Sequence, residues 1–359
     1  MELEKWIRQG ILVQQAYAVE QVSCPIKLDA NENPFSLSEE LHQAFLKTVG
    51  EIPLNRYPEA GSVELCRRYA GHFGVGPDMV MIGNGSDELI QLLVSATGGL
   101  DTSVLIPVPT FAMYRISAQN LGHRLLEIPL DDELDLNLEP MLAAIAERRP
   151  CLVFLSYPNN PTGRCFRSDR IEAILNASTG MVVVDEAYFH FSGKTFLPLL
   201  ARHENLVVLR TLSKAGFAAM RIGFLIASAP LVHELNKIRL PYNLNAFSQA
   251  AARFYLDHEG EFLRQVREIL RLRDDLVRDL ALLGGVEPYP TDANFIFFRC
   301  VFDVDRIYRE LFRRGILVKA FGSPAAVGNC IRVTVGTERE NGEFVRALKD
   351  VLSEVRSVI

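Results

Sequence analysis

Three short apolar runs, each followed at once by a polar loop, constrain the fold of this chain more than any other feature. Residues 151–156, 181–184 and 207–209 are almost wholly apolar, which is typical of buried strands. From residue 79 to residue 227 such runs alternate with helical patterns. This alternation predicts an α/β fold built on a mostly parallel, doubly wound sheet. Sheets of this kind bind their ligands beyond the carboxyl ends of the strands.

The length and composition of the chain suit a globular protein of about two domains. It has 359 residues, of which 48% are hydrophobic and 23% are charged. The formal net charge of −6 argues against a nucleic-acid partner. No apolar run reaches the roughly 18 residues of a membrane helix, and the charged N-terminus lacks the apolar core of a signal peptide. We therefore expect a cytoplasmic protein that binds neither nucleic acid nor a membrane.

The six cysteines and seven histidines are dispersed along the chain. Their spacing forms neither a disulfide framework nor a zinc motif. We therefore expect reduced thiols and no protein-bound metal.

The alternation of strand and helix patterns stops beyond residue 230, and we place the domain boundary near residue 243. One long helix or a kinked pair is expected over residues 246–281, and short strands and two further helices follow it. This pattern predicts a second, smaller α+β unit. We expect an N-terminal arm and part of the small domain over 1–35, a large cofactor-binding domain over 36–243, and a small C-terminal domain over 244–359.

Polar side chains follow each of the three apolar runs named above: Asn160, Asp185 and Lys214. Parallel strands end at one edge of their sheet, so we expect these side chains to lie close together. A lysine amine there can form a Schiff base with a carbonyl. A buried carboxylate is costly without a cationic partner. A pyridine ring that bears an aldehyde would supply both partners.

A phosphate-binding set is predicted beside these residues. A glycine loop, residues 83–88, lies between a strand and a helix, where free backbone N–H groups face an anion. Hydroxyl and charged side chains that can hold the same anion are Ser86, Asp87, Thr211, Ser213 and Arg221. An alternative is that Ser86 or Asp87 only caps the helix. An aldehyde and a phosphate on one small molecule predict pyridoxal phosphate as the cofactor.

Each residue at the strand ends has a task that this cofactor requires. Asp185 can keep the pyridine nitrogen protonated, which makes the ring an electron sink. Asn160 and the phenol of Tyr188 can donate hydrogen bonds to the phenolate oxygen of the ring. Lys214 can then serve as the base that moves a proton. Neighbouring positive charge, including that of Arg221, should lower the pKa of its amine.

The order of motifs along the chain resembles that of the fold-type I pyridoxal-phosphate-dependent aminotransferases, and within them the histidinol-phosphate aminotransferases. The segments that carry the resemblance are residues 29–35, 56–58, 83–88, 109–111, 158–163, 184–188, 211–214 and 331–336. On composition alone, residues 31–34 would indicate only a connecting turn.

The resemblance implies transamination between L-histidinol phosphate and 2-oxoglutarate, which gives glutamate, in histidine biosynthesis. An aromatic amino acid aminotransferase, or an enzyme with both activities, is the alternative. A threonine-phosphate decarboxylase is a more distant one. A regulator that keeps the fold as a sensor would need a DNA-binding domain, for which the chain has no room.

The resemblance also implies roles for residues outside the strand ends. In this family the residue at Tyr57 reaches the cofactor phosphate of a neighbouring subunit, which implies a homodimer. The aromatic ring at Phe111 stacks on the cofactor. Arg332 is expected to bind both the carboxylate of glutamate and the phosphate of histidinol phosphate, with Tyr17 nearby. A planar guanidinium can bind either anion through two parallel hydrogen bonds.

Two positions depart from the pattern of many family members. Six residues, not seven, separate Lys214 from Arg221, so the loop between them must be tighter. Lys319 stands where many members have a second arginine. A lysine keeps the positive charge for the substrate phosphate but loses the bidentate fork.

Overall fold

The computed structural model describes residues 3–14, 24–98, 101–322 and 327–356. Its largest element is a seven-stranded sheet with the order β2-β8-β7-β6-β5-β3-β4. Strand β8 runs in the direction opposite to the other six strands of this sheet. The predicted mostly parallel α/β sheet is therefore confirmed. The strands are β2 (Val80–Asn84), β3 (Ser103–Val108), β4 (Arg124–Pro129), β5 (Leu152–Ser156), β6 (Met181–Asp185), β7 (Leu206–Thr211) and β8 (Ile222–Ile226).

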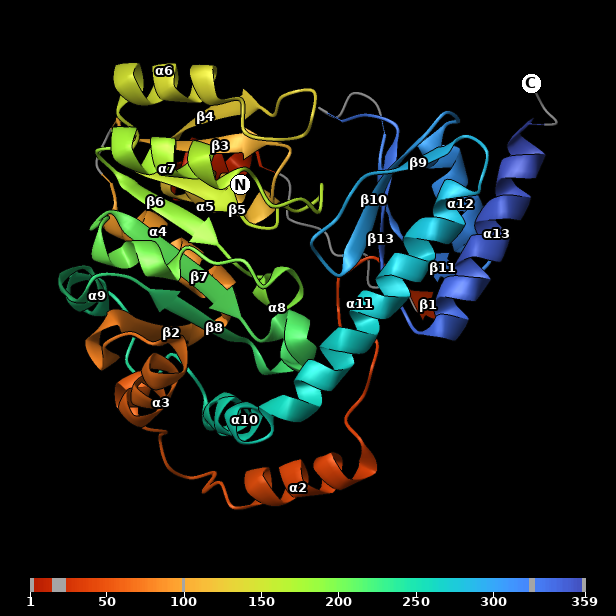
Figure 1. The fold of residues 1–359 in the computed structure, drawn as a ribbon. Helices are drawn as coiled ribbons and strands as arrows, with labels where there is room; N and C mark the ends of the chain where they lie inside the picture. Colours follow the sequence, from red (N-terminus) through yellow and green to blue (C-terminus); the bar gives the residue numbers. More distant parts are fainter. Residues whose placement is uncertain (1–2, 15–23, 99–100, 323–326, 357–359) are drawn as a thin grey trace.

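Helices cover both faces of this sheet (Figure 1). On one face, Val182 and Val184 of β6 share a core with α3 (Val63–Phe73), α6 (Leu138–Arg148) and α7 (Ser168–Ala177). On the other face, Val183 packs with α4 (Gly85–Ala96), α5 (Ala112–Leu121) and α9 (Ala229–Asn236). Successive strand residues point to opposite faces, so a strand covered on both sides must be apolar throughout. This explains the unbroken apolar runs in the sequence.

The second unit is built on a four-stranded antiparallel sheet with the order β12-β13-β10-β9. Its strands are β9 (Val286–Pro288), β10 (Phe295–Cys300), β12 (Lys319–Phe321) and β13 (Cys330–Thr334). Helices α12 (Val304–Arg313) and α13 (Glu338–Arg356) pack on it. A short strand near the N-terminus, β1 (Ile26–Lys27), pairs in parallel with β11 (Ile316–Leu317), which joins the start of the chain to this unit.

One long helix, α11 (Glu259–Ala281), connects the cores of the two sheets (Figure 1). Phe262 near its start lies in the core of the large sheet, whereas Leu276 and Leu280 lie in the core of the small one. Helix α10 (Ala246–Asp257) also packs in the large core, against α2 (Glu39–Gly50). The domain division after residue 243 stays a prediction, and this packing favours a later one inside α11.

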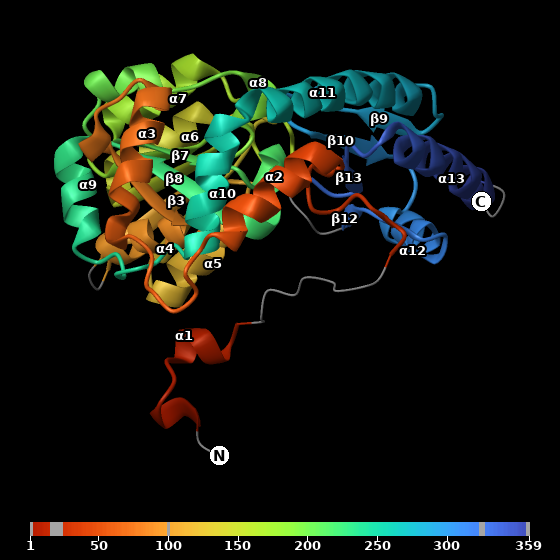
Figure 2. The ribbon, with the colours of Figure 1, turned by 90° about the horizontal axis from the view of Figure 1, so that it is seen from below.

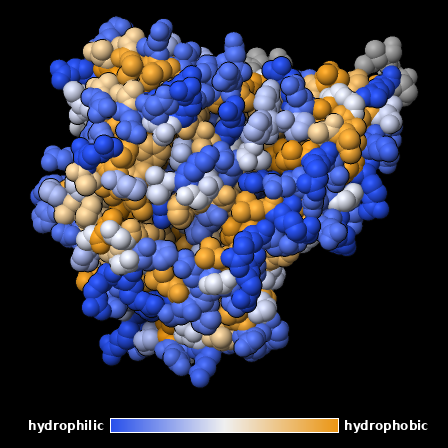
Figure 3. All heavy atoms as spheres, in the orientation of Figure 1, coloured by the Kyte–Doolittle hydropathy of each residue, from blue (hydrophilic) through white to orange (hydrophobic). Residues whose placement is uncertain are grey.

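The short first helix, α1 (Gln9–Leu12), lies at the periphery of the molecule and contacts α5 (Figure 2). On the face shown in Figure 3, hydrophobic and hydrophilic side chains are interspersed. The small remaining helix α8 (Phe189–Ser192) follows β6 and approaches α11. Among the helices of the described ranges, none combines the length and the hydropathy needed to cross a membrane.

A close backbone approach at Gly223 positions the start of α4 on the sheet. Gly223 is buried in β8 and pairs with Gly83 of β2. A Cβ atom at Gly223 would lie 2.4 Å from the carbonyl carbon of Gly85 and 2.5 Å from the backbone nitrogen of Ser86. The N-terminus of α4 can rest on β8 only because this side chain is missing.

We expect Gly223→Ala to destabilise the protein by about 1–3 kcal/mol, the usual cost of overpacking, because the backbone of α4 would have to move. The matched control is Gly71→Ala in α3, where a Cβ atom meets nothing within 4 Å. That change should stabilise the helix by up to about 1 kcal/mol. Thermal unfolding of both variants checks this, and equal melting temperatures would contradict it.

Candidate active site

The residues that follow β5, β6 and β7 lie at one edge of the large sheet. In the register of these strands Asp185 is paired with Ser156 on one side and with Leu209 on the other. The loops that carry Asn160 and Lys214 therefore flank Asp185. The site is built from neighbouring parallel strand ends, the arrangement in which open α/β sheets place their ligands.

The Lys214 amine is held at the junction of the two sheets. Its Nζ donates a hydrogen bond to the carbonyl oxygen of Ala30 at 3.0 Å. Removal of the amine from water, reinforced by the charge of Arg332, lowers the pKa of Lys214 to about 8. A lysine with this pKa is partly uncharged near neutral pH, so it can act as a nucleophile and as a base.

The Asp185 carboxylate is 2% exposed and is held by two hydrogen bonds. The Tyr114 hydroxyl donates to its Oδ2 at 2.7 Å, and the backbone N–H of Ala187 donates to its Oδ1 at 3.1 Å. Burial raises the pKa of Asp185 to about 6 although both bonds oppose the shift. A cationic N–H group beside this carboxylate would favour its ionised form, as a protonated pyridine nitrogen does.

Arg332 brings the small sheet into the site. It lies in β13, is 8% exposed, and its Nη1 donates to the Asn160 side-chain oxygen at 2.5 Å. Its Nη2 donates to the carbonyl oxygen of Asp29. Lys319 of β12 is the direct cross-strand partner of Arg332 and is exposed. The planar guanidinium of Arg332 and the amine of Lys319 thus come from directly opposite positions on neighbouring strands.

The segment Asp29–Asn31 joins these groups. Composition alone indicated only a turn near it, whereas the family resemblance included it. Its three successive carbonyl oxygens accept hydrogen bonds from Arg332, Lys214 and Asn294. The Asn31 side chain donates to the Tyr188 hydroxyl at 2.9 Å. A connecting segment without helix or strand therefore contacts three of the predicted site residues.

The start of α4 and Arg221 form a candidate cradle for an anion. Helix α4 begins at Gly85, so Ser86 and Asp87 lie in its first turn, where N–H groups lack intrahelical partners. Arg221 Nη2 lies 2.9 Å from Asp87 Oδ2, and its Nη1 lies 3.4 Å from Ser213 Oγ. A Cβ atom at Gly85 would lie 2.5 Å from Arg221 Nη2, so glycine makes room for the guanidinium.

This cradle fits a phosphate group. A helix N-terminus, a guanidinium and hydroxyls are the donors that phosphate groups accept from in proteins. Thr211 adds a second hydroxyl, 2.9 Å from that of Ser213. The tight loop after Lys214 is accommodated because Gly216 and Arg221 both adopt positive φ, 126° and 52°.

The buried side chain of Asn159 ties together the loops that carry Asn160 and Phe111. It accepts a hydrogen bond from Thr110 and donates to the Pro109 carbonyl oxygen and the Thr162 hydroxyl. Phe111 itself is partly exposed and packs edge-on against Tyr114, with ring centroids 5.5 Å apart. The sequence singled out Asn160 and Phe111 but missed Asn159 and Tyr114, which hold parts of the site in place.

One of the sequence-predicted residues, Tyr57, lies apart from this group. Tyr57 is 80% exposed and stacks on Tyr242 with ring centroids 4.5 Å apart. Tyr17 lies outside the described residues. Within the described part of the chain, no group of three or more His, Cys, Asp or Glu side chains could hold a metal ion.

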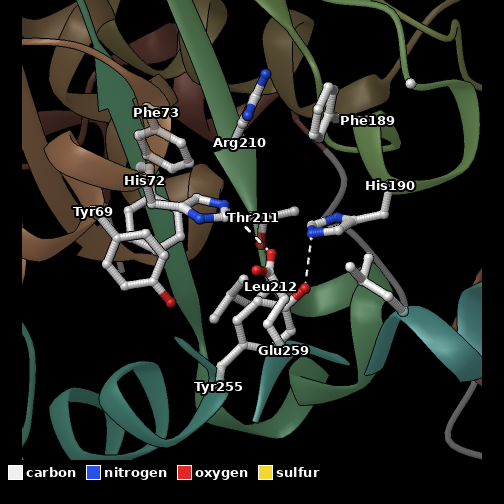
Figure 4. Close-up of a pocket in the computed structure, with 13 residues that line it drawn as sticks. Tyr69, His72, Phe73, Phe189, His190, Arg210, Thr211, Leu212, Tyr255 and Glu259 are labelled. Atoms are coloured by element: carbon white, nitrogen blue, oxygen red, sulfur yellow. Dashed lines mark hydrogen bonds and ion pairs between the residues drawn. The ribbon is translucent and has the colours of Figure 1, made fainter. Parts of the chain in front are cut away.

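A cavity of about 380 Å³ is lined by Arg210 and Thr211 at the carboxyl end of β7, and its walls are mainly aromatic (Figure 4). Neither Lys214 nor Asp185 lines it. Arg210 in its wall forms a buried ion pair with Glu186 at 3.0 Å, and its guanidinium lies 3.5 Å from the centre of the Phe189 ring. Glu186 follows Asp185 in the chain, so this pair supports the strand end from the face opposite the candidate site.

Comparison with known proteins places this geometry in context. The sequence model of the family "Aminotransferase class I and II" matches residues 24–348. The histidinol-phosphate aminotransferase 2 of Nitrosococcus oceani is 44% identical over 96% of this chain and 97% of its own length. The histidinol-phosphate aminotransferase of Aquifex aeolicus is 40% identical over 98% and 99%.

Solved structures agree with these sequence matches. The histidinol-phosphate aminotransferase of Sinorhizobium meliloti, solved in complex with pyridoxal-5′-phosphate, superposes with a TM-score of 0.88 at 25% identity. The superposition covers 99% of this chain and 98% of that one.

His190, which lines the cavity at the end of β7, leads to a prediction about how stability depends on pH. Burial, followed by the charge of Arg210, lowers the pKa of His190 to about 4 from its usual 6.5. Between these values the unfolded chain binds the proton and the folded protein does not, so His190 contributes less stability as pH falls. We expect His190→Gln to reduce the loss of stability between pH 7.5 and pH 5 by about 1–2 kcal/mol.

Urea unfolding at the two pH values measures this effect. The variant His42→Gln, at an exposed position in α2, is the control and should keep the pH dependence of the original protein. An unchanged pH dependence in His190→Gln would show that this imidazole does not change its protonation on unfolding.

Proposed function

This chain belongs to the class I and II aminotransferases and, within them, to the histidinol-phosphate aminotransferases, and we propose that it transfers an amino group between L-histidinol phosphate and 2-oxoglutarate. Pyridoxal phosphate is its cofactor, and histidine biosynthesis is the setting of the reaction. The observation that carries the proposal is the meeting of Lys214 and Asp185 at the strand ends with Arg332 from the small sheet.

The chain offers donors for each part of the cofactor. Bound pyridoxal phosphate supplies an aldehyde for amine exchange and a ring that withdraws electrons from the reacting carbon. Arg221, the start of α4 and nearby hydroxyls would hold its phosphate, and Asp185 would keep the ring nitrogen protonated. Asn160 and Tyr188 would donate hydrogen bonds to the ring oxygen, and Phe111 would cover the ring. The raised pKa of Asp185 supports this assignment, because a cationic partner relieves the cost of its burial.

Lys214 has two tasks in this proposal. Its amine would hold the cofactor, and once released it would take a proton from the substrate carbon that bears nitrogen. A pKa of about 8 leaves an appreciable fraction of the amine uncharged at neutral pH, as a base requires. The Ala30 carbonyl, 3.0 Å from Nζ, holds the released amine in the site.

Arg332 binds the anionic groups of both substrates in turn. A guanidinium can pair with the carboxylate of 2-oxoglutarate or with the phosphate of histidinol phosphate through two parallel hydrogen bonds. Lys319 beside it adds a positive charge that favours the phosphate. Tyr17 remains a predicted neighbour of the substrate, outside the described residues.

The exposed apolar surface around Tyr57 supports a homodimer. Leu54, Tyr57 and Leu240 are 80%, 80% and 71% exposed, and Tyr57 stacks on Tyr242. Exposed apolar residues that gather in this way mark protein–protein contacts. We propose that a second copy of the chain covers this surface, so that Tyr57 reaches the cofactor phosphate of the partner. The six free thiols accord with a reaction in the cytoplasm.

The test of this function is a half-reaction followed by absorbance. The protein should bind pyridoxal phosphate and show its visible band. L-histidinol phosphate at low concentration should remove the band, and 2-oxoglutarate should restore it. Lys214→Ala, which lacks the amine, should show neither the band nor turnover. A response mainly to phenylalanine would instead identify an aromatic aminotransferase, and a response to threonine phosphate that 2-oxoglutarate does not reverse would identify a decarboxylase.

We expect Arg332→Lys to lower kcat/KM for both histidinol phosphate and 2-oxoglutarate by about 10- to 100-fold, because the charge stays but the fork is lost. The control is Arg339→Lys, at a position where the side chain is 77% exposed. Steady-state kinetics with each substrate in turn measure the effect. A loss confined to one substrate would show that Arg332 does not serve both.

A further inference from the structure

We propose that Asn31 is a positioning residue, which turns the hydroxyl of Tyr188 so that its proton points at the ring oxygen of the cofactor. The proposal rests on the function proposed above and adds a residue that acts through Tyr188. Asn31 lies 157 positions from Tyr188 in the chain, in a segment without helix or strand.

Asn31 is fixed in place from several sides. Its side chain is 1% exposed, and its φ of 54° lies in the left-handed region, which asparagine adopts more readily than most residues. Its backbone N–H donates to the Thr334 hydroxyl at 2.9 Å, and its carbonyl accepts from Asn294 at 3.0 Å. Both partners belong to the unit that carries Arg332.

The Thr334 hydroxyl sets the orientation of the Asn31 amide. It accepts the backbone N–H of Asn31 and gives its own single proton to Asn31 Oδ1 at 3.2 Å. This places Nδ2 at the other end of the amide, where it donates to the Tyr188 oxygen at 2.9 Å. The reverse orientation would remove the acceptor of the Thr334 hydroxyl proton and would draw the Tyr188 proton towards Asn31.

The amide orientation decides what Tyr188 can do. A phenol oxygen that accepts from Asn31 directs its own proton elsewhere. The Tyr188 ring is 4% exposed and packs edge-on against Phe295, with centroids 5.2 Å apart, so it has little freedom to reorient. Asn31 thus makes Tyr188 a donor to the ring oxygen. Chains of hydrogen bonds polarise one another, so the bond from Asn31 also makes Tyr188 a stronger donor.

The pH dependence of the visible band reports this donor. In the loaded protein the Lys214 nitrogen would lose its proton as pH rises, and the ring oxygen would be left with its negative charge. The anion depends most on Tyr188 in that state, so loss of the donor raises the pH at which the band changes. A charge-assisted hydrogen bond is strong enough to move this midpoint by about one unit or more.

The experiment compares Asn31→Asp, Tyr188→Phe and the double variant, each loaded with pyridoxal phosphate. A carboxylate at position 31 accepts the Tyr188 proton and cannot donate. We expect both single variants to keep the band with a raised midpoint, and the double variant to match Tyr188→Phe. The uncharged change Asn33→Ala is the control. Asn33 lies in the same segment as Asn31, but its side chain bonds to Gln265 of α11 and to the Ala215 carbonyl oxygen and not to Tyr188, so its midpoint should not move.

The outcomes separate this proposal from its alternatives. An unmoved midpoint in Asn31→Asp would overturn it. A further rise in the double variant would also overturn it, because the new charge would then act without Tyr188. Melting temperatures of the cofactor-free variants show whether each one folds. If Asn31→Asp does not fold, Thr334→Val should raise the midpoint and Thr334→Ser should restore it. The absence of any band in the unchanged protein would reject the proposed function itself.

Discussion

The parallel pairing of β5, β6 and β7 is the constraint on which the rest of the site depends. Because both faces of these strands are covered by helices, their side chains are apolar up to the last one or two residues, and chemistry is confined to the strand ends and the loops beyond them. Asp185 is the last residue of β6, and its depth accounts for its raised pKa. The same depth lowers the pKa of Lys214, so one physical effect moves an acid and a base towards neutrality.

Much of this arrangement could be predicted from the sequence, because it depends on local patterns. Apolar runs predicted the strands, and the residues that follow them pointed to Asp185 and Lys214. The closeness of their loops was expected because parallel strands end at one edge of a sheet, whereas the strand order came only from the structure. The family resemblance added Arg332, whose place at the site depends on a second sheet that no local pattern locates.

The residues that the sequence did not reveal act through partners far along the chain. Tyr114 looked like part of an ordinary helix, yet its hydroxyl meets Asp185, 71 positions later. Asn31 looked like part of a turn, and its contacts with Thr334 and Tyr188 arise only when the N-terminal segment lies between the two sheets. A hydrogen bond across such a separation leaves no periodicity in either segment, so only the folded structure shows it.

The long helix α11 has a mechanical consequence for catalysis. It begins in the core of the large sheet and ends in that of the small one, and its 23 residues span about 35 Å. Helix α10 ends at Asp257 and α11 begins at Glu259, so His258 is a one-residue joint between them. A turn of about 5° at that joint would carry the far end of a rod this long through about 3 Å. The small sheet, which carries Arg332 and Lys319, would thus approach a substrate, while Asp185 and Lys214 at the strand ends of the large sheet stayed still.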